Sequence, residues 1–338
     1  MALSDRVRTF GQHLRSLHGE RVHKIALNAG LSCPNRDGTK GRGGCIFCNN
    51  GSFTPRDEGP PPIHEQIAAG RAVVARRTGA RKLIAYFQAY TNTHSDLGHL
   101  RALYDQALAE EDVLGLSVGT RPDCLPPAVL DLLCEIRDQG KIVWLELGLQ
   151  SSFDATLERV RRGHTLEDYR QATLAARDRG IPVCTHLIVG MPGESALHAR
   201  VTLDRVLELG IDGLKLHPLH VVKNTLLAKA HASGEYVPWT LPAYLETAAD
   251  LIERTPETVF YHRVTGTCPP ELLIAPEWCG KKWEVINGIE ATLARRGTRQ
   301  GSRLRRLDSM IHTLVPPALG CGYLPRHALE LTLGGGRR

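Results

Sequence analysis

Three cysteines in one polar, glycine-rich stretch are the residues of this sequence best suited to chemistry. The stretch "LSCPNRDGTKGRGGCIFCNNGSF", residues 31–53, places Cys33, Cys45 and Cys48 at a C-x11-C-x2-C spacing. A disulfide needs an even number of cysteines, and a structural zinc site usually takes four ligands. Three thiolates are the count for a metal centre that keeps one coordination position open. The spacing therefore predicts a metal centre held by these three cysteines.

Other interpretations of the three cysteines stay open at this point. The loop could be a zinc knuckle completed by His64 or another distant ligand, or it could hold three unrelated thiols. Thiolates are soft ligands that suit iron–sulfur clusters as well as zinc. The glycines between the cysteines allow the tight turns that bring distant thiols together. The polar loop, placed after a predicted strand, favours the cluster.

Composition narrows the class of protein. The chain has 338 residues, of which 42% are hydrophobic and 23% charged, values typical of globular proteins rather than disordered or fibrous ones. We find no apolar run near the ~18 residues of a membrane span, and "MALSDRVRTF" lacks the apolar stretch of a secretory signal. We therefore expect a cytoplasmic protein, away from membranes, whose thiols stay reduced. The net charge of +6 permits an anionic partner.

Strand-like and helix-like patterns alternate through the first two thirds of the chain. The six predicted strands cover 22–28, 82–88, 113–119, 141–149, 181–189 and 212–220. Between them, apolar residues recur at three- and four-residue intervals, as in "HEQIAAGRAVVARR" and "PAVLDLLCEIRDQG", which indicates helices lying on a sheet. Six such units favour a parallel sheet with right-handed crossovers.

The polar residues choose between a doubly wound sheet and a barrel. Each predicted strand ends in polar groups, such as Gln88, Arg121 and Gln150, and chemistry collects at this end of the strands in parallel α/β barrels. A doubly wound sheet would concentrate them at one switch point. We therefore predict an α/β fold, a partial (β/α)6 TIM-type barrel over 17–256. A C-terminal extension over 257–338 is expected to face the substrate.

Four motifs in this order carry a family resemblance. They are the three-cysteine loop, "GTRPD", "ELGLQSSFDATLERVRRGHT" and "HLIVGMPGES". With these motifs the chain resembles a radical S-adenosylmethionine (SAM) enzyme of the YhcC-like branch. That branch is related to the Elongator catalytic subunit and to oxygen-independent coproporphyrinogen oxidase. The resemblance covers residues 17–256, and "FYHRVTGTCPPELLIAPEWCGKKWEVINGIE" resembles the YhcC-like branch alone.

The resemblance implies a [4Fe-4S] cluster on Cys33, Cys45 and Cys48 whose open iron takes the amino and carboxylate groups of SAM. Reductive cleavage of SAM would then give the radical that abstracts hydrogen from the substrate. The same resemblance assigns SAM contacts to seven positions. They are Phe47 and Gly190 at the adenine, Gln88 or Thr91 at the amino group, Gln150 and His186 near the ribose, and Arg162 at the carboxylate.

The motifs do not identify the substrate. One hypothesis is an RNA substrate such as tRNA, supported by the Elongator-like motifs and by a basic helix pattern near residue 290. A second is an enzyme that acts on a small molecule or a peptide, and a third, from a different class, is a zinc-stabilised RNA-binding module without catalysis. The radical chemistry further implies a reductase or a flavodoxin-type protein as electron donor.

Overall fold

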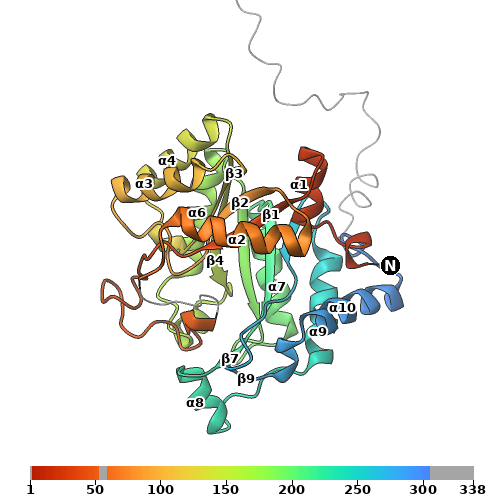
Figure 1. Cartoon of the computed structure of the whole chain (residues 1–338). Helices are drawn as coiled ribbons and strands as arrows, with labels where there is room; N and C mark the ends of the chain where they lie inside the picture. Colours follow the sequence, from red (N-terminus) through yellow and green to blue (C-terminus); the bar gives the residue numbers. More distant parts are fainter. Residues whose placement is uncertain (1, 53–58, 305–338) are drawn as a thin grey trace, which may run out of the picture. The chain divides into compact units, whose positions relative to one another are not determined.

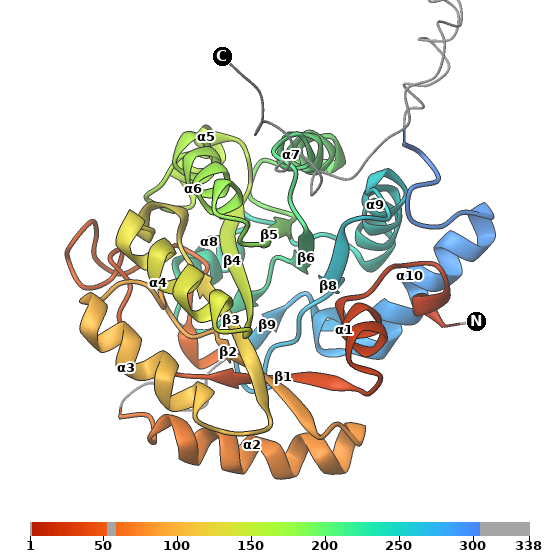
Figure 2. The same cartoon turned by 90° about the horizontal axis from the view of Figure 1, so that it is seen from above.

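A parallel sheet of seven strands is the frame of the protein in the computed structural model, which describes residues 2–52 and 59–304. Its strand order is β1-β2-β3-β4-β5-β6-β8, and every neighbouring pair is parallel. The strands are β1 (Val22–Leu27), β2 (Lys82–Phe87), β3 (Val113–Thr120), β4 (Ile142–Gln150), β5 (Val183–Val189), β6 (Gly213–Pro218) and β8 (Phe260–Arg263). The sheet curls into a half-barrel, which confirms the predicted partial TIM-type fold (Figure 2).

Helices cover the outer face of this half-barrel (Figures 1 and 2). These helices are α2 (Ile63–Thr78), α3 (Leu97–Leu108), α4 (Pro127–Asp138), α5 (Asp154–Arg159), α6 (Leu166–Asp178), α7 (Ala196–Glu208) and α9 (Leu241–Arg254). Helix α8 (Leu226–Ala232) lies apart from them, against the short strand at Val221–Val222. Buried aliphatic side chains fill the space between helices and sheet, among them Ile67, Leu100 and Leu116. This core fixes the strands from outside and leaves their inner face for other groups.

Helix α1 (Phe10–His18) contacts both β1 and β8, the two edge strands of the sheet. Its Phe10 ring packs on Trp144 of β4 and stacks on His262 of β8, with ring centroids 4.9 and 3.9 Å apart. These apolar rings fill one end of the barrel interior. The polar groups of the interior therefore face the other end, where the strands finish.

The seventh strand, β8, comes from the segment that we expected to belong to the C-terminal extension. A four-residue strand carries too short an alternation to predict from sequence. Two further strands, β7 (Val221–Val222) and β9 (Leu273–Ala275), form a separate antiparallel pair, and α10 (Lys282–Arg296) packs on α9. Residues 305–338, the last part of the predicted extension, lie outside the described residues. Within the described part, none of the helices combines the length and apolarity that crossing a membrane requires.

Candidate active site

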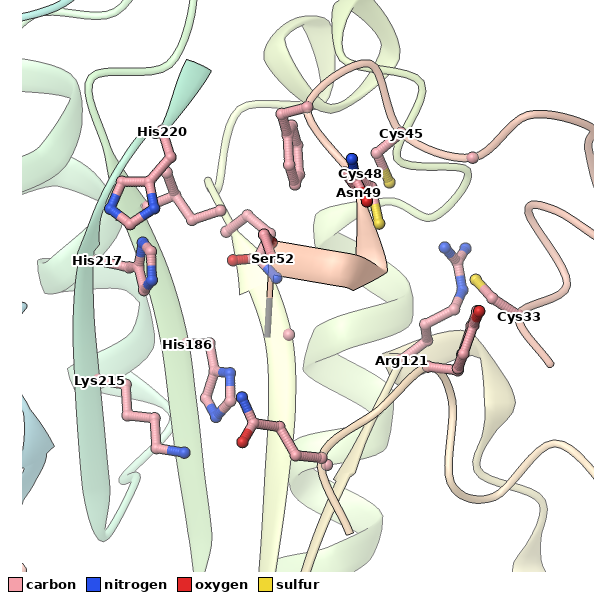
Figure 3. A pocket seen from close by; sticks show the side chains of 18 of the residues that line it. Cys33, Cys45, Cys48, Asn49, Ser52, Arg121, His186, Lys215, His217 and His220 are labelled. Atoms are coloured by element: carbon pink, nitrogen blue, oxygen red, sulfur yellow. The ribbon is translucent and has the colours of Figure 1, made fainter. Parts of the chain in front are cut away.

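A cavity of about 260 Å³ opens where the strands of the half-barrel end. Parallel strands finish at the same rim, so their last side chains meet around this space. Strands β2 to β6 line it with Tyr86, Thr120, Glu146, His186 and Lys215, respectively. The long loop after β1 covers another side, as Figure 3 shows. The predicted gathering of polar groups at one rim is therefore confirmed.

The loop between β1 and α2 brings all three predicted metal ligands to this cavity. Cys45 and Cys48 are joined by a turn in which the backbone N–H of Cys48 donates to the carbonyl of Cys45 at 3.0 Å. Gly44, just before this turn, has a φ of +80°, a conformation that favours glycine. In Figure 3 the sulfur atoms of Cys33, Cys45 and Cys48 point toward a common part of the cavity.

The spacing of these sulfur atoms bears on which metal they could hold. Among the described residues, only Glu146, Cys184 and His186 bring three possible ligand atoms within 4.8 Å of one another. The three loop sulfurs are therefore spread more widely. A tetrahedral zinc ion, with Zn–S bonds of about 2.3 Å, needs sulfurs about 3.8 Å apart. A cluster of several irons can be held by sulfurs that lie further apart. His64, the suggested additional zinc ligand, does not line the cavity. The zinc alternative is not supported.

Nitrogen donors surround the cysteine sulfurs. The Asn35 amide and the Arg162 guanidinium lie 3.6 and 3.7 Å from the Cys45 sulfur, and the Arg36 guanidinium lies 3.9 Å from the Cys48 sulfur. Burial, followed by the charge of Cys45, raises the pKa of the Cys48 thiol to about 11. A free thiol there keeps its proton, so its thiolate form depends on added positive charge. Bound iron would bring that charge.

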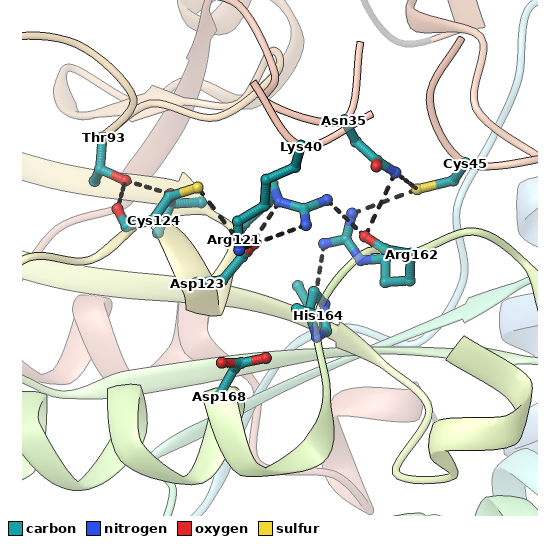
Figure 4. A network of polar contacts seen from close by, with 12 residues as sticks. Asn35, Lys40, Cys45, Thr93, Arg121, Asp123, Cys124, Arg162, His164 and Asp168 are labelled. Carbon is teal, nitrogen blue, oxygen red and sulfur yellow. Dashed lines mark hydrogen bonds and ion pairs between the residues drawn. The ribbon is translucent and has the colours of Figure 1, made fainter. Parts of the chain in front are cut away.

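A buried ionic network ties the cysteine loop to the barrel (Figure 4). Arg121, only 2% exposed, forms two hydrogen bonds of 2.9 Å with the carboxylate of Asp123. Its third nitrogen donates to the carbonyl of Arg162 at 2.8 Å, and Lys40 of the loop pairs with Asp123. Burial alone would raise the pKa of Asp123, but the hydrogen bonds from Arg121 and Lys40 lower it to about 2. The "GTRPD" motif thus positions the loop.

Two of the predicted SAM contacts carry buried polar atoms without a partner. The Nε of Arg162 and the Oγ1 of Thr91 are buried and make no hydrogen bond to any described residue. Both residues line the cavity. The other end of the Arg162 guanidinium is fixed, because it donates to the carbonyl of Gly148 at 2.7 Å. Buried polar atoms are rarely left unpaired in a native protein, so these two point to a ligand.

Gln150 lies at an irregular end of β4. Its φ is +80°, rare for a residue with a side chain, and the pairing with β5 shifts register between Gly148 and Gln150. Such bulges redirect side chains and are frequent next to active sites. Gly148 allows this arrangement, since a methyl group there would lie 2.8 Å from both Arg162 and Gln150 side chains. Phe47 and Gln88 also line the cavity.

His186 and Gly190 complete the predicted set. His186 lines the cavity, and its Nε2 lies 2.6 Å from the Glu146 carboxylate. Gly190 follows β5 with a φ of +94°, and its carbonyl accepts a hydrogen bond from the Tyr236 hydroxyl at 2.8 Å. It is not among the residues that line the cavity. The structure therefore brings together all of the predicted site residues except Gly190.

Glu146 forms the floor of the cavity and is fully buried. Its carboxylate pairs with Lys24 of β1 and Lys215 of β6, and Ser117 of β3 donates to it at 2.6 Å. Burial alone would raise the pKa of Glu146, but the charges of Lys215 and Lys24 hold it well below its usual value. Burial lowers the pKa of Lys215 to about 8. A charged carboxylate thus neutralises lysines that the barrel interior could not otherwise hold.

These contacts argue against a metal ion among Glu146, Cys184 and His186. Lys24 and Lys215 already place positive charge on the same carboxylate. A cation there would be repelled by both lysines at short range. The triad is better described as part of the ionic floor.

The sequence predictions missed two residues of this floor. Lys24 and Tyr86 were not singled out as site residues. Lys24 carried a usable signal, because a lysine inside a strand of a parallel sheet requires a partner. Arg263 was expected only as part of a substrate-facing block over 260–288, and its place beside Lys215 was not predicted because β8 was not.

Replacing Glu146 with Gln should lower the free energy of unfolding by about 3–5 kcal/mol at neutral pH, because two buried lysines lose their counter-charge. The pKa of Glu146 is lower in the folded than in the unfolded protein. Its stabilisation is therefore present above the pKa that Glu146 has in the unfolded protein. As pH falls below that pKa, the difference in free energy of unfolding between wild type and Glu146→Gln should become smaller. Urea unfolding followed by circular dichroism measures both effects. The exposed Glu208→Gln is the control, expected within about 0.5 kcal/mol of wild type. Equal stability of the two variants would contradict this role.

Comparison with known proteins agrees with this geometry. The model of the radical SAM superfamily matches residues 36–206, and that of the radical SAM C-terminal domain matches residues 211–295. YhcC of Escherichia coli K12 is 48% identical over 306 residues, covering 90% of this chain and 98% of that protein. A tRNA uridine(34) acetyltransferase of Dehalococcoides mccartyi is 29% identical over 192 residues, covering 56% of this chain and 40% of that protein.

A solved structure shares the fold. The Elp3 protein of the archaeon Methanocaldococcus infernus matches with a TM-score of 0.64 and 18% identity, covering 82% of this chain and 64% of that one. The identity to YhcC extends over nearly the full length of both proteins. The chain is therefore a radical SAM enzyme and belongs, within the radical SAM superfamily, to the family of YhcC.

Proposed function

We propose that Cys33, Cys45 and Cys48 hold a [4Fe-4S] cluster that binds SAM, and that the enzyme acts on RNA. The convergence of three thiols on a cavity whose wall holds unpaired polar atoms carries this proposal. When bound, the cluster supplies the electron that cleaves SAM, and SAM supplies the radical that takes hydrogen from the substrate. Three protein ligands leave one iron for SAM. A reductase or a flavodoxin-type protein would deliver the electron.

The residues of the cavity would each have one task toward these groups. The Asn35, Arg36 and Arg162 donors near the sulfurs would stabilise negative charge on the thiolates. The unpaired Nε of Arg162 would receive the SAM carboxylate, for which a guanidinium is well shaped. The unpaired Oγ1 of Thr91 would accept from the SAM amino group.

Four further residues would position the nucleoside part of SAM. Phe47 would lie against the adenine, and Gln150, held in its unusual backbone conformation, would reach the ribose. His186 would use its Nδ1 for the ribose, because its Nε2 already faces Glu146. Gly190 would support the adenine from behind the cavity wall, through the backbone of β5.

The RNA part of the proposal rests on the related tRNA uridine(34) acetyltransferase and on the surface near α10. That relative is named for tRNA, and this chain spans 40% of its length, so its acetyl transfer is not part of the proposal. Trp283 is 70% exposed, and the Lys282 ammonium lies 5.7 Å from its ring. An exposed ring beside a cation suits a nucleic-acid base and its phosphate.

We also propose that the chain divides into a core at 17–256 and a substrate-facing extension at 257–338. Arg263 and Thr267, from the described part of this extension, line the cavity. The extension would thus present the substrate to the SAM that the core holds.

Changing Cys33, Cys45 or Cys48 singly to Ala should abolish both iron binding and SAM cleavage, because each thiolate holds its own iron. Iron content and release of 5′-deoxyadenosine after anaerobic reconstitution measure the two. Cys134, which does not line the cavity, is the matched control, and Cys134→Ala should retain both. Normal iron content and cleavage in any one of the three variants would remove that cysteine from the ligand set.

Arg162→Lys should weaken SAM binding about 10- to 150-fold, the range expected for loss of a charge-assisted hydrogen bond, and leave iron content near that of wild type. Lysine keeps the charge and loses the planar fork, so the change tests geometry. Equilibrium dialysis with labelled SAM gives the dissociation constant. The control is Arg170→Lys on the exposed face of α6. An unchanged constant in Arg162→Lys would leave this arginine a structural role only.

Cells that lack this protein should lose a modified nucleoside from their tRNA, which mass spectrometry of tRNA hydrolysates would detect. The wild-type gene should restore it, and a gene carrying Cys33→Ala should not, because the chemistry requires the cluster. The matched Cys134→Ala gene should restore it as well. An unchanged tRNA profile together with an altered small metabolite would replace RNA by a small-molecule substrate.

A further inference from the structure

The wall of the cavity opposite the cysteines carries a row of basic side chains. His186 of β5 is the register partner of Lys215 of β6, and Lys215 is the partner of Arg263 of β8. Partners in neighbouring strands point to the same face of a sheet, and so do residues two apart along one strand. His217 therefore joins the row, and all four residues line the cavity. Figure 3 shows Lys215, His186 and His217 across the cavity from the cysteines.

Arg263 is the cation in this row that the protein does not neutralise. Within residues 2–52 and 59–304, its guanidinium has no hydrogen-bond or ion-pair partner, whereas Lys215 is paired with Glu146. The single carboxylate of the cavity floor is already shared by Lys24 and Lys215. Positive charge on this wall thus exceeds negative charge, and Arg263 itself is exposed to solvent at the end of β8. A cavity with unmatched positive charge is suited to an anion.

His220 provides a second, independent observation. It lines the same cavity, its ring lies 4.6 Å from that of His217, and its Nε2 is buried without a partner among the described residues. Burial, followed by the charge of Arg263, lowers the pKa of His220 to about 4, so the ring is neutral at neutral pH. A neutral imidazole can carry its proton on Nε2 and donate it to an oxygen. His217 differs, because its Nδ1 already faces the carbonyl of Pro218 at 2.7 Å.

From the position of Arg263 and the unpaired His220 nitrogen, we infer that this wall binds an oxyanion group of the substrate. A guanidinium fork takes a phosphate or a carboxylate through two parallel hydrogen bonds, and the His220 Nε2–H would add a third. The shared chemistry is a group with two or more equivalent oxygens. The inference rests on the proposed function in one respect, namely that SAM occupies the cysteine side and leaves this wall to the substrate.

The place of Arg263 on the last strand of the sheet bears on how the substrate would be oriented. Strand β8 is an edge strand, and both its Arg263 and Thr267, in the segment that follows it, line the cavity. An anion held there would lie between the core and the extension. The substrate would then be oriented by its charged group while another of its atoms faces the cysteine side.

The test uses the cluster-loaded protein saturated with SAM and titrated with inorganic phosphate or acetate. Histidine-labelled protein reports binding through the ring resonances of His217 and His220, assigned from His217→Gln and His220→Gln spectra. Saturable shifts are expected in wild type, with affinity about 10- to 150-fold weaker in Arg263→Gln. The matched control is Arg299→Gln, whose arginine pairs with Glu257 on the surface, and it should bind as wild type does.

Two measurements separate this inference from the proposed function. Iron content and the SAM dissociation constant of Arg263→Gln should equal those of wild type. A wild-type protein that bound no iron or no SAM would count against the proposed function alone. Tighter binding of phosphate would identify a nucleotide phosphate as the group, and tighter binding of acetate a carboxylate. Equal anion affinity of Arg263→Gln and wild type would overturn the inference. Loss of anion binding when SAM is added would also overturn it, since SAM itself would then occupy the wall.

Discussion

The carboxylate of Glu146 connects side chains from every strand of the seven-stranded sheet. It contacts Lys24, Ser117, His186 and Lys215 directly, and the ring of His262 lies 3.6 Å away. Tyr86 of β2 is connected to Glu146 through Lys215, whose ammonium donates to the Tyr86 hydroxyl at 2.9 Å. A half-barrel lacks the remaining strands that would close it and fill its interior. In this half-barrel one shared carboxylate pairs with the charged and polar side chains of the interior.

The cysteine loop depends on a different charge pair. The loop has no helix or strand between β1 and its first helical turn, so backbone hydrogen bonds such as that from Ile46 to the Val160 carbonyl, together with side-chain contacts, position it. Arg121 and Asp123 supply it, because together they hold Lys40 of the loop and the carbonyl of Arg162. Asn35 adds a hydrogen bond of 2.5 Å to the carbonyl of Arg161. The cysteines proposed as metal ligands and the arginine proposed for SAM therefore share one support.

The sequence predicted the parts of the protein that follow from periodicity and residue type. The six long strands were found because short runs rich in apolar residues alternate with helix-like patterns, and the cysteine loop because three thiols in a polar stretch have few other uses. Strand β8 was missed because four residues give no measurable alternation. The Glu146 cluster was only partly predictable, since Glu146, His186 and Lys215 are polar residues inside strands but their meeting depends on how the strands are arranged in space. Arg263 and the spacing of the sulfurs are properties of three dimensions that no local pattern contains.

The position of β8 in the sheet has a consequence for how the protein is made. Strand β6 has β5 on one side and β8 on the other, and β8 is separated from β6 in the chain by α8 and α9. During synthesis on the ribosome, one edge of β6 has no partner strand until residue 263 has emerged. The N-terminal segment also lacks its partner until then, because the Arg8 carbonyl accepts a hydrogen bond from the backbone N–H of Tyr261, and Thr9 pairs with Tyr261 in a β-bridge. The N-terminal segment and β8 are thus far apart in the chain but adjacent in the sheet, and until β8 is made β6 keeps an unpaired edge of the kind on which incompletely folded chains aggregate.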